Sequence, residues 1–98
     1  MNFIYKIRHK PTGLYYSGRP LSDAAIRHLA HSLGRNLTSE DRLHAQFNKA
    51  GKNYNRSMDA KNMLAYRASH IHDRDKEIFQ QCEVIMFELE EKGVVYAP

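Results

Sequence analysis

The pattern of apolar and polar positions at the start of the chain predicts a β-hairpin. Residues 2–9 are rich in aromatic and β-branched side chains, and residues 14–18 form a second run of the same kind. Pro11 and Gly13 lie between the two runs and favour a turn there. Pro20 follows the second run and ends the predicted strand.

The alternation along the first strand divides its side chains between two faces of the predicted sheet. Tyr5 shares a face with Phe3 and Ile7, so we expect its ring to lie toward the core. Lys6 and Arg8 share the opposite face, and we expect both side chains to be exposed.

Apolar residues at helical spacing predict several helices in the middle of the chain. Serine and threonine stand where N-caps belong, and glycines stand where the first two helices would end. The predicted helices run from Ser22 to Gly34, from Thr38 to Gly51, from Ser57 to Arg67 and, as one or two turns, within residues 73–81. We expect residues 69–73 to interrupt the third helix and residues 52–56 to form a loop or a short strand.

Residues 82–89 form the best single strand in the sequence. Apolar side chains occupy both of its faces, so we expect this strand to be central in a sheet or covered by a helix. Gly93 and residues 94–96 predict a further edge strand. Together the elements predict an α+β fold with a single domain over residues 1–98. Its small antiparallel sheet, made of the N-terminal hairpin and the C-terminal strand, would be covered on one face by two to four short helices.

Composition places the chain among globular proteins. It has 98 residues, of which 42% are apolar and 27% charged, so we expect one modest core and no extensive disorder. No apolar run is long enough to span a bilayer and no basic leader precedes an apolar segment, so we expect a cytoplasmic protein. Cys82 is the only cysteine, which excludes an internal disulfide, and its place in an apolar run predicts a buried, unreactive thiol.

The net charge of +4 is unevenly distributed along the chain. Residues 1–56 hold ten Lys and Arg against three Asp and Glu, a net charge of +7, whereas residues 57–98 hold five against eight, a net charge of −3. This asymmetry predicts one cationic face, which is typical of a nucleic-acid-binding surface and also of a merely solubilising one. Tyr16 is the aromatic residue that we most expect to be exposed on it. The predicted binding residues are Lys6, Arg8, Lys10, Tyr16, Arg19, Arg27, Lys49 and Lys52.

Three segments resemble the GIY-YIG nuclease family. Residues 3–5 (Phe-Ile-Tyr) and 16–18 (Tyr-Ser-Gly) are similar to the paired motifs that open that domain, and residues 47–51 (Phe-Asn-Lys-Ala-Gly) are similar to a segment of phage-encoded homing endonucleases. The resemblance implies three catalytic residues, and it implies a glutamate on a later helix that holds Mg²⁺. The implied catalytic residues are Tyr5, Tyr16 and Arg27.

The chain departs from that family in two ways that bear on activity. Phe3 stands where the motif has glycine, and only residues 90–98 follow the last long strand, too few for the helix that would carry the metal-binding glutamate. Without the metal, phosphodiester cleavage lacks its Lewis acid and its charge neutralisation. We therefore favour a non-catalytic protein with no metal or other cofactor, and keep an active or degenerate GIY-YIG-type nuclease as the alternative.

A second resemblance covers more of the chain. Four ordered blocks are similar to small tailed-phage proteins that open with a strand containing Lys-x-Thr-Gly-Leu and close with a strand of the form Glu-Val-x-x-x-Glu-Leu. The blocks are residues 7–15, 49–54, 59–64 and 83–89. This resemblance implies a viral accessory protein in the host cytoplasm and a compact fold, but no particular activity.

The six histidines give no convergent ligand set. His28 and His31 would share one helix face, whereas a zinc site needs three or four ligands that meet at one point. Beside Arg27 and Arg35, these two histidines would instead enlarge the cationic face.

Three functions remain open from the sequence. We favour an accessory protein that binds nucleic acid, or a host complex acting on nucleic acid, through its basic face, with inhibition of host defence or host transcription as its biological form. The second is the nuclease alternative given above. The third is a protein-interaction inhibitor that makes no nucleic-acid contact and uses Tyr66 or Tyr96 as an apolar anchor. No feature of the sequence fixes the oligomeric state.

Overall fold

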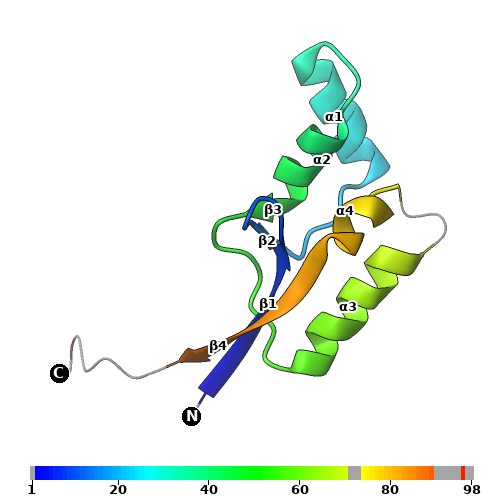
Figure 1. The fold of residues 1–98 in the computed structure, drawn as a ribbon. Coiled ribbons are helices and arrows are strands. Elements are labelled where there is room, and N and C mark those ends of the chain that lie inside the picture. The colour runs from blue at the N-terminus through cyan, green and yellow to red at the C-terminus, as the bar shows by residue number, and fades with distance from the viewer. Residues whose placement is uncertain (1, 71–73, 90–95, 97–98) are drawn as a thin grey trace.

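The computed structural model describes residues 2–70, 74–89 and 96, and within them it has an antiparallel sheet and helices that cover one of its faces (Figure 1). The sheet has four strands in the order β3-β2-β1-β4. The elements are β1 (Asn2–His9), β2 (Tyr15–Tyr16), α1 (Asp23–Leu33), α2 (Ser39–Gln46), β3 (Phe47–Asn48), α3 (Ser57–Ser69), α4 (Lys76–Gln80) and β4 (Cys82–Leu89). The predicted α+β class is confirmed.

Strand β1 lies inside the sheet and pairs with β4 along its whole length, with Ile7 opposite Val84. On its other side Arg8 lies opposite Tyr15 of β2, which confirms the hairpin. The second strand is shorter than the predicted 14–18, because the chain turns away after Tyr16 and the Ser17 amide donates to the carbonyl of Gln46 instead.

The predicted starts of the first two helices are confirmed. The Ser22 side chain accepts a hydrogen bond from the Ala25 amide at the start of α1. Thr38 and Asp41 form a reciprocal capping box at the start of α2, which satisfies two backbone donors that the helix itself leaves without partners. These caps need only neighbouring residues, so the sequence pattern was sufficient to find them.

The predicted end of the second helix is wrong. α2 stops at Gln46 rather than at Gly51, and Phe47 has extended backbone angles (φ −124°, ψ 142°). Phe47 is buried, with its ring against those of Tyr16 and Phe79, and its backbone joins β3 to β2. Aromatic packing and strand pairing together override the local helical pattern at this point.

One core lies between the sheet and the helices. It contains Ile7, Tyr16, Leu43, Phe47, Tyr54, Ala60 and Phe79. Tyr5 packs against this cluster, which confirms that its ring lies toward the core. Helix α3 lies alongside β1 and β4 and covers their core-facing side (Figure 1). Strand β4 is therefore covered by a helix, as predicted, although it stands at the end of the described sheet rather than at its centre.

Two predictions fall wholly or partly on residues outside the described ones. The further edge strand at 94–96 is one of them, since of these residues only Tyr96 is described, and its side chain is exposed. The interruption at 69–73 is the other: α3 ends at Ser69, and residues 71–73 are not described. Within the described ranges, no helix has the length and apolar character needed to cross a membrane.

The Cys82 thiol is half-buried at the start of β4, and burial raises its pKa to about 12. We therefore expect the folded protein to react with iodoacetamide at pH 8 at least ~100-fold more slowly than the urea-unfolded chain, since only the thiolate is nucleophilic. Mass spectrometry of the modified fraction against time measures both rates. Equal rates in the two states would contradict the burial of this thiol.

Candidate nucleic-acid interface

Four of the predicted binding residues gather around the turn that follows β3, a surface that we call the basic turn. They are Lys6, Arg19, Lys49 and Lys52. The Lys6 ammonium donates a hydrogen bond to the Ala50 carbonyl, which brings β1 to this turn. Gly51 has a positive φ of 68°, and a Cβ added to it would lie 2.3 Å from the Cβ of Tyr15. Only glycine fits there, so the turn is held close against β2.

Lys52 connects the basic turn to the interior of the molecule. Its amide donates to the Tyr16 carbonyl at 2.8 Å, and its aliphatic stem lies so close to Gly18 that a Cβ added there would be 2.4 Å from the Lys52 Cδ. Its ammonium lies 4.9 Å from the centre of the Tyr54 ring, within the range of a cation–π contact. Arg19 directly follows Gly18, is exposed, and lines a hollow together with Asn48, Ala50 and Gly51 of the turn region.

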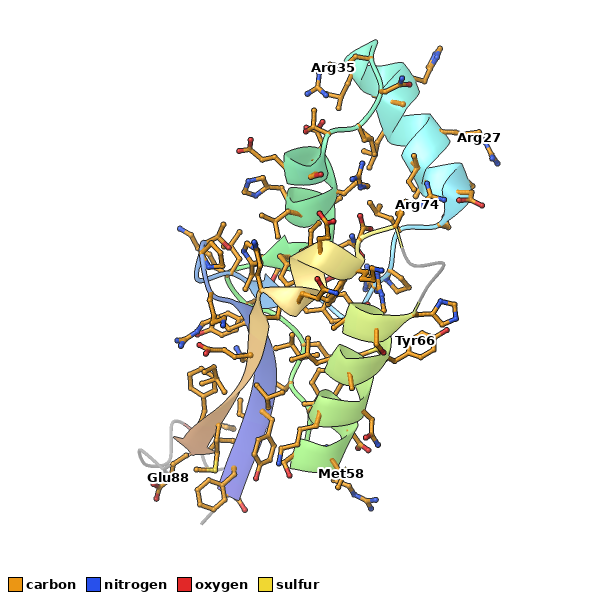
Figure 2. The ribbon with its side chains drawn as sticks, turned by 45° about the vertical axis from the view of Figure 1, so that its right-hand side comes forward. Arg27, Arg35, Met58, Tyr66, Arg74 and Glu88 are labelled. Carbon is orange, nitrogen blue, oxygen red and sulfur yellow. The ribbon has the colours of Figure 1, made fainter. Side chains whose placement is uncertain are left out.

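The structure separates the other three predicted cations from this surface. Arg8 pairs with Glu83 of β4, so its charge is largely balanced. Lys10 is exposed in the hairpin turn, where its amide donates to the Gln81 carbonyl. Arg27 lies on the exposed side of α1, which stands apart from the sheet (Figure 2).

The prediction that Tyr16 is exposed is wrong. Its side chain is 1% exposed, its ring contacts those of Phe47 and Phe79, and its hydroxyl accepts a hydrogen bond from Arg67 at 2.9 Å. The strand register explains this: Tyr16 lies opposite Phe47 on the core face, whereas Tyr15 lies beside Arg8 on the other face. Applying the alternation rule across the hairpin would have assigned the outer position to Tyr15.

Tyr15 has the environment that was predicted for Tyr16. It is half-exposed, and the Lys6 ammonium lies 5.0 Å from the centre of its ring. The Phe87 ring of β4 contacts Tyr15 edge-on at 5.9 Å and lies 5.6 Å from the same ammonium. The outer face of the sheet therefore presents aromatic and cationic groups together.

A buried polar network lies under the core face of the sheet, and the sequence pattern did not reveal it. The Asp75 carboxylate accepts hydrogen bonds from Arg42 at 2.7 Å and from the Gln46 amide at 2.9 Å. Arg67 donates to the Gln46 side-chain oxygen at 3.1 Å, and its guanidinium stacks 4.2 Å from the centre of the Phe79 ring. Charged residues in helical patterns are usually solvent-exposed, so no local signal marks these as interior.

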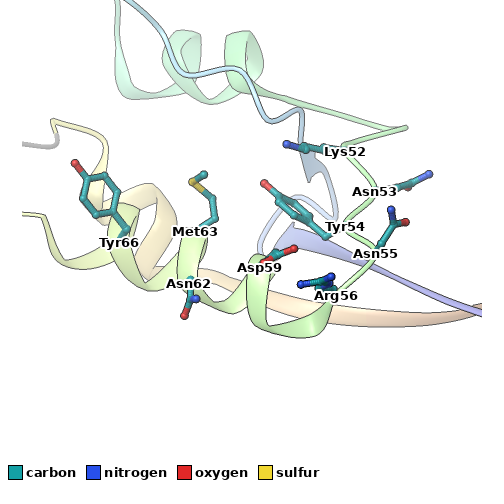
Figure 3. A pocket seen from close by; sticks show the side chains of 9 residues that line it. All are labelled: Lys52, Asn53, Tyr54, Asn55, Arg56, Asp59, Asn62, Met63 and Tyr66. Atoms are coloured by element: carbon teal, nitrogen blue, oxygen red, sulfur yellow. The ribbon is translucent and has the colours of Figure 1, made fainter.

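Two neighbouring hollows lie beside α3, and we call them together the α3 groove; Figure 3 shows the wider of the two. The wider hollow has a volume of about 610 Å³ and the narrower about 400 Å³, and they share Met63 and Tyr66. The wider hollow is lined by Lys52, Asn53, Tyr54, Asn55, Arg56, Asp59, Asn62, Met63 and Tyr66. The narrower adds Tyr16, Gly18, Pro20, Leu21, Arg67, His70, Arg74 and Asp75.

Tyr54 lines the wider hollow and has the most unusual polar group in the groove. Its side chain is 6% exposed, and its hydroxyl has no hydrogen-bond partner among the described residues. Burial raises the pKa of this phenol to about 12, so it is a protonated donor at neutral pH. Figure 3 shows the hydroxyl directed toward the side of the groove where the Lys52 ammonium and Met63 lie.

Basic side chains that do not already pair with a carboxylate of the protein are the ones that can bind an external anion. Four arginines are paired with carboxylates: Arg8 with Glu83, Arg35 with Asp41, Arg42 with Asp75 and Arg74 with Asp23. The residues of the basic turn and Arg56 have no ion pair with a described carboxylate. Lys52 and Arg56 therefore place two such cations in the wider hollow, and Lys52 also belongs to the basic turn.

The residues implied by the nuclease resemblance do not share one hollow. Tyr16 lines the α3 groove, Tyr5 lines two other hollows, and Arg27 lines none of these. In the part of the chain that the structure describes, no three His, Cys, Asp or Glu side chains are grouped so that they could hold a metal ion.

Comparison with protein-family models, with curated proteins and with solved structures gives no match for this chain. Both resemblances stated from the sequence therefore remain predictions.

Proposed function

We propose that this protein is a non-catalytic nucleic-acid-binding protein whose binding surface runs from the basic turn into the α3 groove. The observation that carries the proposal is the position of Lys52. It belongs to the basic turn, it lines the wider hollow, and its ammonium lies over the ring of Tyr54, whose buried hydroxyl has no partner among the described residues. The phage origin and the action on a host complex that the sequence led us to expect remain part of this proposal.

The charges along this surface suit a phosphate backbone. Lys52 and Arg56 line the wider hollow with a single carboxylate, that of Asp59, beside them. Outside it, Arg19 lines a shallow hollow together with Asn48 and Ala50 of the turn region. Phosphate contacts from lysine and arginine supply most of the affinity in non-specific nucleic-acid binding.

The aromatic groups suit the bases. Tyr66 is 57% exposed at the junction of the two hollows, and its ring contacts that of His70 at 4.9 Å. Bases stack on such exposed rings, and each stacked base contributes about 1–3 kcal/mol. A groove that combines an exposed ring with unpaired cations is typical of proteins that bind single strands.

The test compares charge-reversed variants on fluorescent single-stranded and duplex oligonucleotides, by anisotropy at about 50 and about 200 mM salt. We expect affinity to fall steeply with salt. The double variant Lys52→Glu with Arg56→Glu should reduce the slope of log K against log salt by about 1.4 on a single strand, at ~0.7 per lost contact. Lys61→Glu is the matched control, since it reverses an exposed α3 charge that does not line the groove.

The same experiment gives a different outcome for each of the alternative functions. If none of the oligonucleotides binds at the lower salt, nucleic-acid binding is wrong and the protein-interaction alternative takes its place. Equal loss of affinity in the control and in the double variant would contradict the assigned surface. Cleavage that requires magnesium, and that Tyr5→Phe or Arg27→Ala abolishes, would establish the nuclease alternative.

A further inference from the structure

We propose that the narrower hollow of the α3 groove receives one unstacked nucleotide of a bound single strand. Its base would lie against the apolar wall, and its phosphate would lie at the cationic end. This inference rests on the proposed function and makes it more specific, because a base held in a duplex cannot enter such a hollow.

The walls of the hollow have the composition that a base requires. Its apolar lining is made by Pro20, Leu21, Met63 and the Tyr66 ring. The volume of about 400 Å³ falls within the ~300–1,000 Å³ range of small-molecule sites. Such sites combine apolar walls with a few fixed polar groups, as this one does.

Three basic side chains line the same hollow together with the Asp75 carboxylate, and one of the three is held in place by the fold. Arg67 is 8% exposed and is fixed by its hydrogen bonds to Tyr16 and to Gln46. The ring of His70 contacts that of Tyr66 in a tilted arrangement. Arg74 pairs with Asp23 at 2.7 Å, but both of these side chains are more than half exposed. An exposed pair of this kind is weak, so the Arg74 guanidinium can exchange Asp23 for a phosphate.

The Tyr54 hydroxyl is independent evidence that a ligand enters the groove. A buried hydroxyl without a partner is unfavourable in the free protein. Tyr54 and Lys52 line the wider hollow, which shares Met63 and Tyr66 with the narrower one. Figure 3 shows this hydroxyl directed toward the side of the wider hollow where the Lys52 ammonium lies. A phosphate bound at the Lys52 ammonium, which lies over the same ring, would place negative charge beside this unsatisfied donor.

The probes are a decathymidylate and a strand of the same length and charge in which every nucleotide is abasic. We expect the abasic strand to bind about 5- to 150-fold more weakly, the effect of losing one stacked base. Tyr66→Ala should weaken decathymidylate binding by a similar factor without changing the affinity for the abasic strand. Tyr66→Phe should retain the wild-type difference, because stacking needs the ring and not the hydroxyl.

Met58→Ala is the matched control, because Met58 is a similarly exposed α3 residue that does not line the groove. We expect this variant to behave as the wild type with both probes. Folding of Tyr66→Ala is checked by its urea midpoint, which should not change, since Tyr66 is exposed.

The outcomes separate this inference from the proposed function. Equal affinity of the wild type for both strands, with the steep salt dependence retained, would overturn the nucleotide site and leave nucleic-acid binding intact. The nucleotide site is likewise overturned if Tyr66→Ala weakens both strands equally, since the ring would then not contact a base. If neither strand binds at low salt, both proposals fail together.

Discussion

Replacing Phe79 by alanine is expected to reduce the free energy of unfolding by about 3–5 kcal/mol, the usual effect of deleting a buried aromatic ring. Phe79 is 1% exposed, and its ring lies 5.2 Å from that of Tyr16 and 5.5 Å from that of Phe47. The substitution also removes the ring on which the Arg67 guanidinium stacks. Urea unfolding followed by circular dichroism measures the change.

The control for this variant is Met86→Ala on β4. Met86 is 58% exposed, so its truncation should change the free energy of unfolding by no more than ~0.5 kcal/mol. A domain of this size has a total stability of about 5–15 kcal/mol, so a large part of it depends on Phe79. A loss below about 1 kcal/mol in Phe79→Ala would be too small for a deleted core ring and would contradict the position of α4 against the sheet.

Replacing Asp75 by alanine is expected to cost about 3 kcal/mol, the lower end of the range for breaking a buried ion pair. Asp75 is 4% exposed and accepts hydrogen bonds from Arg42 and Gln46. Its removal takes away the charged acceptor of both groups, although Arg42 keeps its hydrogen bonds to Leu37 and Ser39 and Gln46 keeps its bond to the Arg42 carbonyl. We place the effect at the lower end because the Arg42 side chain is itself 21% exposed and can recruit water.

The Asp75→Asn variant tests the contribution of the negative charge, because asparagine has nearly the same shape as aspartate. The amide keeps one acceptor oxygen and the volume of the carboxylate but loses the charge, so we expect a smaller loss of stability than in the alanine variant. Arg35→Ala removes an exposed pair with Asp41 and serves as the surface comparison, with an expected effect below ~1 kcal/mol. If Asp75→Ala and Arg35→Ala reduce the free energy of unfolding equally, the buried polar network does not hold α4 against α2 and α3.

The sequence predicted the features that depend on near neighbours. Strand alternation indicated which face of β1 carries Tyr5, and it indicated that β4 is a strand. The starts of α1 and α2 were predictable because a serine or threonine N-cap needs only the next few amides. The charge asymmetry likewise located the cationic residues in the first half of the chain, several of which form the basic turn.

The sequence pattern failed where a distant contact outweighs a local preference. The helical pattern through residue 50 does not show that Phe47 has a place between two other rings, so the end of α2 was predicted too late. Tyr15 and Tyr16 are adjacent tyrosines, and only pairing with β1 and β3 decides which of them is buried. Arg67 has the appearance of a surface residue until the hydroxyl of Tyr16 and the amide of Gln46 are placed beside it.

The sequence alone therefore determined the α+β class, the caps and the excess of cations, because alternation, capping and composition act over a few residues or none. The tertiary structure decided which of those cations remain unpaired, and it formed the α3 groove from residues 16–21, 52–56, 59–70 and 74–75. It also left the Tyr54 hydroxyl inside that groove without a partner among the described residues. These properties depend on side chains far apart in the sequence meeting in space, which no local pattern specifies.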